Sequence, residues 1–181
     1  MKKISMMLAA ILCCLMTNIS FSSCSSDDND DTNEATSVAK CTYELTLTAG
    51  TGAEDQQDVV KTMVTVPNYT GDETKEFLSI YDDMSVKPTV PFTTFPMTKT
   101  ITIDQSLLDE ASLPAKDSYK VGLHYKLTVT TTDVNGNVID YQLKDMDYSG
   151  TVPASNISKL YPQTTTLTFT VDDGGKVRFG R

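Results

Sequence analysis

The sequence predicts an all-β protein with a single antiparallel β-sandwich, and three observations lead to this prediction. Apolar and polar residues alternate with a period of two after residue 40, as in CTYELTLT at residues 41–48. This period places the apolar side chains on one face of a strand. The polar positions are rich in threonine, whose β-branched side chain suits a pleated sheet with one wet face. Asn-Gly and Gly-Gly segments separate two pairs of these runs, which is typical of hairpins.

Strands are expected wherever the alternation recurs. The expected ranges are 41–48, 59–66, 76–81, 97–103, 119–133, 138–145, 164–171 and 176–180. Residues 41–181 therefore form one domain, which is long enough to bury its own core.

Residues 1–23 have the layout of a secretory signal peptide. Lys2 and Lys3 precede an apolar run over residues 6–16, and small polar residues follow. This run is shorter than the roughly 18 to 20 apolar residues that a membrane-spanning helix needs. We therefore expect residues 1–23 to be cleaved.

The stretch Phe21-Ser22-Ser23-Cys24 resembles a bacterial lipobox. This resemblance implies that Cys24 carries a diacylglycerol and becomes the mature N-terminus. The Ser- and Asp-rich residues 25–34 resemble the export signal of Bacteroidetes-type lipoproteins, which implies an outer-membrane protein that faces the cell exterior. The same composition is also typical of a disordered acidic tether, here expected over residues 24–40.

Charge and cysteine usage exclude several classes of function. The formal net charge is −9, and cleavage of residues 1–23 would remove two lysines and no acid, making it −11. Nucleic acids and anionic head groups bind clustered basic residues, so neither is an expected partner. Beyond the lipidated cysteine, only Cys41 would remain, so no internal disulfide is possible. Cys41 alternates in phase with apolar residues, which predicts a buried thiol.

The segment between the runs 119–133 and 138–145 predicts a hairpin with a three-residue loop at residues 135–137. This loop places Val129 opposite Leu143, and Thr131 opposite Tyr141, on the apolar face. A two-residue turn would shift the pairing by one residue and reverse the faces. Gly136 or Asn137 is expected at positive φ.

A second hairpin is expected around residues 173–175. As in the first hairpin, odd-numbered residues are expected to pair with odd-numbered residues, which joins Val171 to Val177 and Phe169 to Phe179.

The middle of the chain offers two local signals. Residues 104–111 predict a short helical turn with Asp104 as its N-cap. Leu113, Pro114 and the strand-leading Tyr119 resemble the tyrosine corner of immunoglobulin-like and fibronectin type III sandwiches. This resemblance implies an immunoglobulin-like sandwich. The alternative is a transthyretin-like sandwich of the fimbrillin type, because Bacteroidetes fimbrillins also combine such domains with lipidation.

No group of residues predicts catalysis, a cofactor or a metal site. His124 is the only histidine and lies in phase with polar residues, which predicts a surface position. No second histidine or cysteine pair accompanies it to bind zinc. Residues 133–137 lack the later ligands of a calcium loop and are interpreted as a turn. The paired acids at 82–83 and 172–173 are interpreted as solvated strand ends, so a non-enzymatic protein is expected.

Residues 84–97 carry three prolines and several apolar residues. The prolines disfavour a central strand. One interpretation is a crossover that buries both Phe92 and Phe95 in the end of the sandwich. The other is that Phe92 or Phe95, with Val90, is exposed and binds a partner.

Two functions are consistent with these features. The first is a surface-displayed binding or adhesion module that contacts an extracellular glycan or protein through loops at one end of the sandwich. The absence of tryptophan slightly disfavours a glycan. The second is a structural subunit of a surface or fimbria-like assembly that adds an edge strand to a neighbour.

Overall fold

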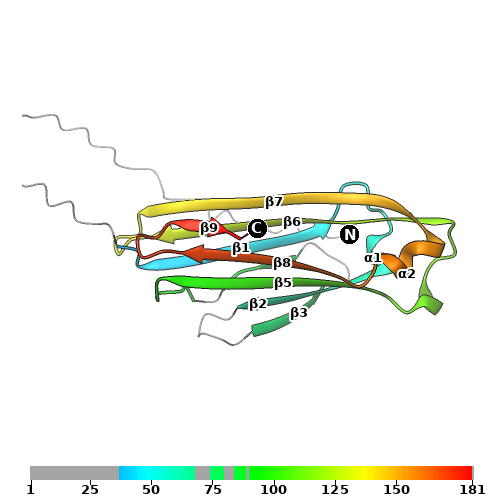
Figure 1. Cartoon of the computed structure of the whole chain (residues 1–181), viewed down its shortest axis with the longest axis horizontal. Coiled ribbons are helices and arrows are strands. Elements are labelled where there is room, and N and C mark those ends of the chain that lie inside the picture. The colour runs from blue at the N-terminus through cyan, green and yellow to red at the C-terminus, as the bar shows by residue number, and fades with distance from the viewer. Residues whose placement is uncertain (1–36, 68–73, 80–83, 89, 181) are drawn as a thin grey trace, which may run out of the picture. The chain divides into compact units, whose positions relative to one another are not determined.

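The computed structural model describes residues 37–67, 74–79, 84–88 and 90–180, and these residues form an antiparallel β-sandwich (Figure 1). The prediction of an all-β sandwich is confirmed. No helix of this described part is long and apolar enough to cross a membrane. The strands are β1 Lys40–Ala49, β2 Val60–Pro67, β3 Thr74–Ser79, β4 Met84–Val86, β5 Met97–Leu107, β6 Ser118–Thr132, β7 Val138–Pro153, β8 Gln163–Val171 and β9 Val177–Phe179. The short helices are α1 Gln56–Val59, η1 Glu110–Ser112, η2 Ala154–Asn156 and α2 Ile157–Leu160.

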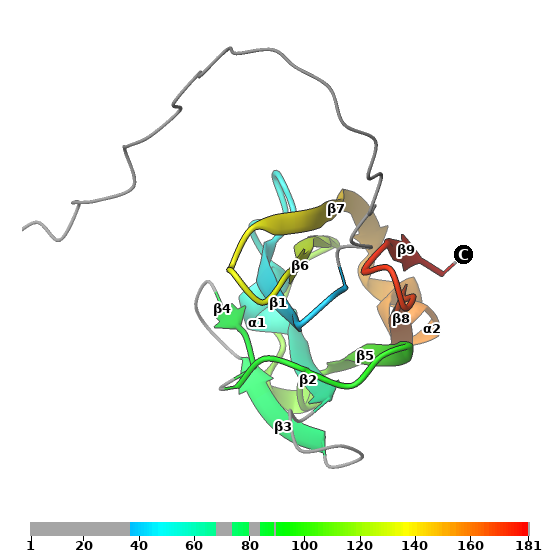
Figure 2. The same ribbon diagram turned by 90° about the vertical axis from the view of Figure 1, so that its left-hand side faces the viewer.

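The two sheets have the strand orders β4-β1-β6-β7 and β3-β2-β5-β8-β9 (Figure 2). β1 and β2 therefore lie in different sheets. In immunoglobulin domains the first two strands share a sheet, in the orders ABED and CFG. The sandwich found here thus has a different strand order, in which β6 crosses over to pair with β1.

The core follows from the alternation of the strands. In β1 the odd residues from Cys41 to Leu47 are buried and the even ones are exposed or half-buried, as the sequence predicts. The main cluster lies between the two sheets. A second cluster lies where the short helices α1 and α2 meet the start of β6, and consists of Val59, Val60, Tyr119, Val121, Ile157 and Tyr161.

The corner between β5 and β6 carries the hydrogen bond expected of a tyrosine corner. The Tyr119 hydroxyl donates to the carbonyl of Pro114 at 2.7 Å. Tyr119 is buried in the second cluster, so its ring anchors the start of β6 while its hydroxyl binds the incoming chain. This local resemblance is confirmed even though the strand order differs.

The positive φ predicted at Gly136 and the pairing predicted around the second turn are confirmed, but the three-residue loop predicted at residues 135–137 is wrong. Gly136 has φ +87°, a conformation that glycine adopts without strain. Around the second turn, Val171 pairs with Val177 and Phe169 with Phe179, as expected.

The predicted register of the β6–β7 hairpin is wrong. Val129 lies opposite Gln142, not Leu143, and Thr131 lies opposite Asp140. The loop spans residues 133–137, closed by the Asp133 N–H donating to the Asn137 carbonyl at 3.0 Å, and a register shift follows between Thr131 and Thr132. The prediction assumed that β7 buries its apolar set, but β7 is an edge strand, so burial did not select the register.

The predicted helical turn over residues 104–111 is also wrong. β5 continues to Leu107, because Gln105 pairs with both Thr62 of β2 and Gln163 of β8. Pairing on both sides outweighs the local capping signal at Asp104. The helical turn begins later, as η1, with the Asp109 carboxylate accepting from the Ala111 N–H at 3.1 Å.

Candidate functional site

The sequence-predicted partner segment lies at the end of the sandwich next to the 133–137 turn. Phe92 forms a β-bridge with Cys41, with N–O distances of 2.8 and 2.9 Å, and its ring stacks near Tyr43 at 6.2 Å between centroids. Phe92 is only 5% exposed, so the interpretation of this ring as an exposed anchor is wrong. Phe95 is half-buried and packs against the core, whereas Val90 is exposed. The role of Val90 and Phe95 in binding stays a prediction.

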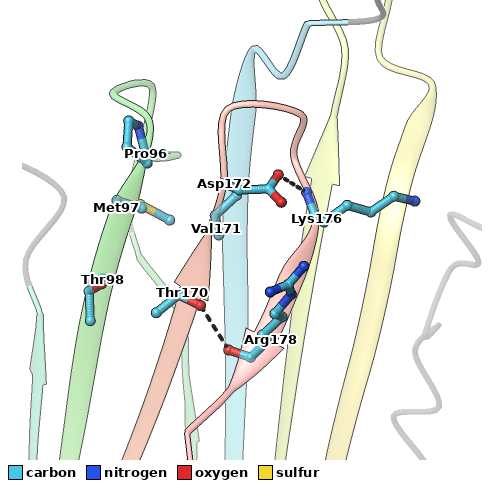
Figure 3. A pocket seen from close by; sticks show the side chains of 8 residues that line it. All are labelled: Pro96, Met97, Thr98, Thr170, Val171, Asp172, Lys176 and Arg178. Carbon is cyan, nitrogen blue, oxygen red and sulfur yellow. Dashed lines mark hydrogen bonds between the residues drawn. The ribbon is translucent and has the colours of Figure 1, made fainter.

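A pocket of about 290 Å³ lies near this end, on β5, β8 and β9 (Figure 3). Thr170 and Arg178 are cross-strand neighbours there, and the Asp172 carboxylate accepts from the Lys176 N–H at 2.9 Å. Figure 3 shows the Lys176 side chain pointing away from the other lining side chains. None of the lining residues is aromatic: Pro96, Met97, Thr98, Thr170, Val171, Asp172, Lys176 and Arg178. The pocket can hydrogen-bond a polar group but offers no ring for sugar stacking.

The exposed apolar side chains gather mainly on β7. Of the seven large apolar side chains that are exposed in the described residues, five lie on β7 and one in the turn before it. The seven are Val90, Val134, Val138, Tyr141, Leu143, Met146 and Tyr148. Scattered single apolar residues are ordinary on a surface, but a group on one strand marks an interaction surface. We call residues 138–148 the β7 surface.

The β7 surface has two faces. Asp145 points outward, since it accepts from Lys126 at 3.3 Å and binds the His124 ring at 2.7 Å. Tyr141 and Leu143 share the parity of Asp145 and therefore the outer face. Tyr148 points the other way, toward the second sheet, where its hydroxyl donates to Gln105 Oε1 at 3.2 Å. Apolar side chains are thus exposed on both faces of this edge strand.

Asp145 on the outer face of β7 binds two charged or polar side chains of β6, His124 and Lys126. Hydrogen bonding to the His124 ring lowers the pKa of Asp145, and Lys126 lowers it further. His124 therefore lies on the polar outer face, as the sequence predicts, where it contacts an acid and a lysine. A charged carboxylate on an edge strand also opposes indiscriminate strand pairing.

Asp140 joins β7 to β9. Its carboxylate accepts from the Val177 N–H at 2.9 Å, the Tyr141 N–H at 2.8 Å and the Gln142 side-chain amide at 3.0 Å. Burial opposes ionisation of Asp140, but the hydrogen bond from Val177 and then that from Gln142 outweigh it, so its pKa is lowered. This contact ties the edges of the two sheets together at one end.

Two other residues considered in the sequence, Cys41 and Asp133, contribute to the fold. Burial raises the pKa of the Cys41 thiol to about 12, which keeps it protonated at neutral pH. Asp133 caps its turn by accepting from the Asn135 and Asn137 N–H groups, both at 2.8 Å. No group of three or more potential metal-ligating side chains is found in the ranges that the structure describes. Cys24 and Asp82-Asp83 lie outside those ranges.

The β7 surface was not predicted, although one signal for it is present in the sequence. Tyr141 and Leu143 alternate with Gln142 and Lys144, and this pattern was interpreted as a buried face. Alternation identifies two faces of a strand, but it does not say whether another sheet covers the apolar one.

Comparison with protein-family models, with curated proteins and with solved structures finds no match to this chain.

Proposed function

We infer that this protein is a non-enzymatic, lipid-anchored surface lipoprotein that acts as a binding or adhesion module for an extracellular protein. The observation that carries the inference is the concentration of exposed apolar side chains on the β7 surface. Exposed apolar groups on an edge strand of a folded domain are costly in water and favour contact with a partner.

The location is supported by residues 1–34, with their signal-like layout, lipobox-like Cys24 and acidic stretch. Several acyl chains on Cys24 would hold the protein at the membrane, because each buried methylene contributes roughly 0.8 kcal/mol. A lipoprotein on the outer face of the outer membrane would present its β-sandwich to extracellular partners.

A protein is favoured over a glycan as the partner. The pocket in Figure 3 has no aromatic side chain among its lining residues. The β7 surface instead offers tyrosine and aliphatic side chains, and tyrosine is enriched in protein interfaces.

A structural subunit of a surface assembly is the second candidate. The longest strand of the described residues, β7, has 16 residues and lies at the edge of its sheet. A long edge presents unpaired backbone groups to which a neighbour's strand can add. Concentration-dependent self-association of the purified protein would favour this candidate.

Antibody staining of intact and permeabilised cells tests the location. Staining of intact cells is expected. Staining only after permeabilisation would overturn surface display and leave periplasmic components as partners.

A photo-crosslinking side chain at Tyr141, introduced in the full chain on intact cells, tests the binding surface. A discrete cross-linked species is expected from position 141 and not from Thr100, an exposed position on the outer face of the other sheet. The double substitution Tyr141→Ser and Leu143→Ser is expected to abolish adhesion, whereas the control substitution Thr100→Ser, at an exposed position of the other sheet, preserves it. Equal cross-linking from both positions would contradict the assignment of β7.

A further inference from the structure

The short strand β9 covers only part of the edge of β8. At the end next to the 133–137 turn, β9 lies between β7 and β8, since it binds Asp140 of β7 and pairs with Phe169–Val171 of β8. β9 ends at Phe179, whereas β7 continues well past it (Figure 1). Within the described ranges, no strand pairs with residues 163–167 of β8 on the β9 side. We call the unpaired edge of β8 at residues 163–167, together with residues 144–150 of β7 beside it, the open flank.

Backbone groups of β8 point into the open flank. The Gly180 N–H donates to the Thr168 carbonyl at 2.7 Å, so Thr168 directs its backbone groups to the β9 side. In an antiparallel ladder, alternate residues direct these groups to the same side. Thr166 and Thr164 therefore present their N–H and C=O groups to the open flank, where β9 does not reach them.

Side chains of β7 are uncovered in the same place. Met146 and Tyr148 belong to the set that faces the second sheet, yet they are 47% and 37% exposed. Tyr148 also hydrogen-bonds the Thr165 side chain of β8, so its ring bridges the two strands. A strand in line with β9 would cover both side chains.

A buried amide beneath the open flank lacks a partner. Gln105 is 2% exposed, and its Nε2 group has no hydrogen-bond partner among the described residues. Its Oε1 atom accepts from Tyr148, which places the amide next to the opening. An unsatisfied buried donor is costly, and an acceptor brought in from outside would relieve it.

We propose that the open flank receives an extended segment of the partner protein as an additional strand, in line with β9 and antiparallel to β8. This inference rests on the proposed function, in which the partner is a protein, and adds the site and the form in which the partner binds. Backbone hydrogen bonds to Thr164 and Thr166 supply affinity that does not depend on sequence, and alternate side chains supply specificity.

The register of β8 defines the chemistry of that segment. Five residues lie opposite residues 163–167. The two inward positions opposite Leu167 and Thr165 take apolar side chains, which cover Met146 and Tyr148. The inward position opposite Gln163 takes a side chain with an oxygen acceptor, because Gln163 is the register partner of Gln105. The partner segment thus alternates threonine-like outward residues with two apolar inward residues and one asparagine-like residue.

Hydrogen exchange at single-residue resolution tests the proposal on the full chain in detergent micelles. The probe is the synthetic peptide acetyl-VTVTN-amide, and the matched control carries N-methyl groups on its two threonines. The peptide is expected to slow exchange of the Thr164 and Thr166 amides by about tenfold or more, whereas the N-methylated control leaves them unchanged. Thr166→Pro, which removes an N–H that faces the open flank, is expected to abolish the effect, and Thr166→Val is expected to retain binding.

Three results would overturn the strand-receiving site: no protection at millimolar peptide, equal protection by the N-methylated control, or protection confined to another sheet edge. The control peptide decides the outcome even if Thr166→Pro fails to fold. The result is separable from the proposed function, because Tyr141 and Leu143 lie on the outer face and not in the open flank. Adhesion that survives their replacement, together with peptide protection at Thr164 and Thr166, would refute the outer-face surface and retain the open flank.

Discussion

Replacing Phe92 with alanine removes a ring that is 5% exposed and packed against Tyr43 and the main core. Truncating a buried phenylalanine to alanine costs about 3–5 kcal/mol, since apolar burial is lost and a cavity is left. For a domain of this size, each kcal/mol lowers Tm by roughly 2–4 °C. Phe92→Ala is therefore expected to lower Tm by roughly 6–20 °C.

The matched control for this change is Val90→Ala, two residues earlier in the same segment. Val90 is 45% exposed, so its truncation is expected to stay within about 0.5 kcal/mol of the original free energy of unfolding. Differential scanning calorimetry or circular dichroism measures both variants. A Phe92→Ala protein that melts within about 2 °C of the original would show that the ring is not part of the core.

Three further outcomes are expected. A Cβ atom added by Gly122→Ala would lie 2.2 Å from the Tyr148 carbonyl, so β6 and β7 must separate, and urea unfolding should show a loss of about 1–3 kcal/mol or more. Tyr119→Phe keeps the ring and removes the hydrogen bond of the corner, so the same assay should show a loss of about 0.5–1.5 kcal/mol, and no change would mean that this bond is not stabilising. The pKa of Asp55 lies below its ordinary 3.8, chiefly through its hydrogen bond with the Lys116 side chain. The ionised Asp55 therefore stabilises the fold fully above pH 3.8, and this stabilisation is lost as pH falls through the lowered pKa. Asp55→Asn should therefore lower the urea midpoint at pH 7, and this difference should begin to shrink below about pH 3.8 and disappear only below the lowered pKa. A difference that stays constant as pH falls below 3.8 would contradict the ion pair.

The strand predictions succeeded where a local pattern and a buried face coincide. In β1 and β8 the apolar set faces the other sheet, so alternation in the sequence matches burial in the structure. The turn residues also acted locally, because a positive φ at Gly136 depends on the absence of a Cβ and not on distant contacts.

The site could not be predicted because it depends on which strands lie at the edges. The sequence of β7 is typical of a strand with one apolar face, and only the order β4-β1-β6-β7 shows that no further strand of the described residues lies beside it. The same holds for β8, because in the part of the chain that the structure describes β9 pairs only with Phe169–Val171. Unpaired edges are a property of the sheet, not of the strand sequence.

The sequence by itself determined the class of this protein: alternating threonine-rich strands, glycine turns, a thiol in phase with the core, and a lipoprotein-like N-terminus as an expectation for its location. These features follow from the period of the chain and from single-residue backbone preferences, which act over a few residues. The tertiary structure alone decided the register of β7, the burial of Phe92 and the open flank between β7 and β8. Those features arise because residues far apart in the chain compete for the same neighbours, and that competition is settled only when the whole sandwich packs.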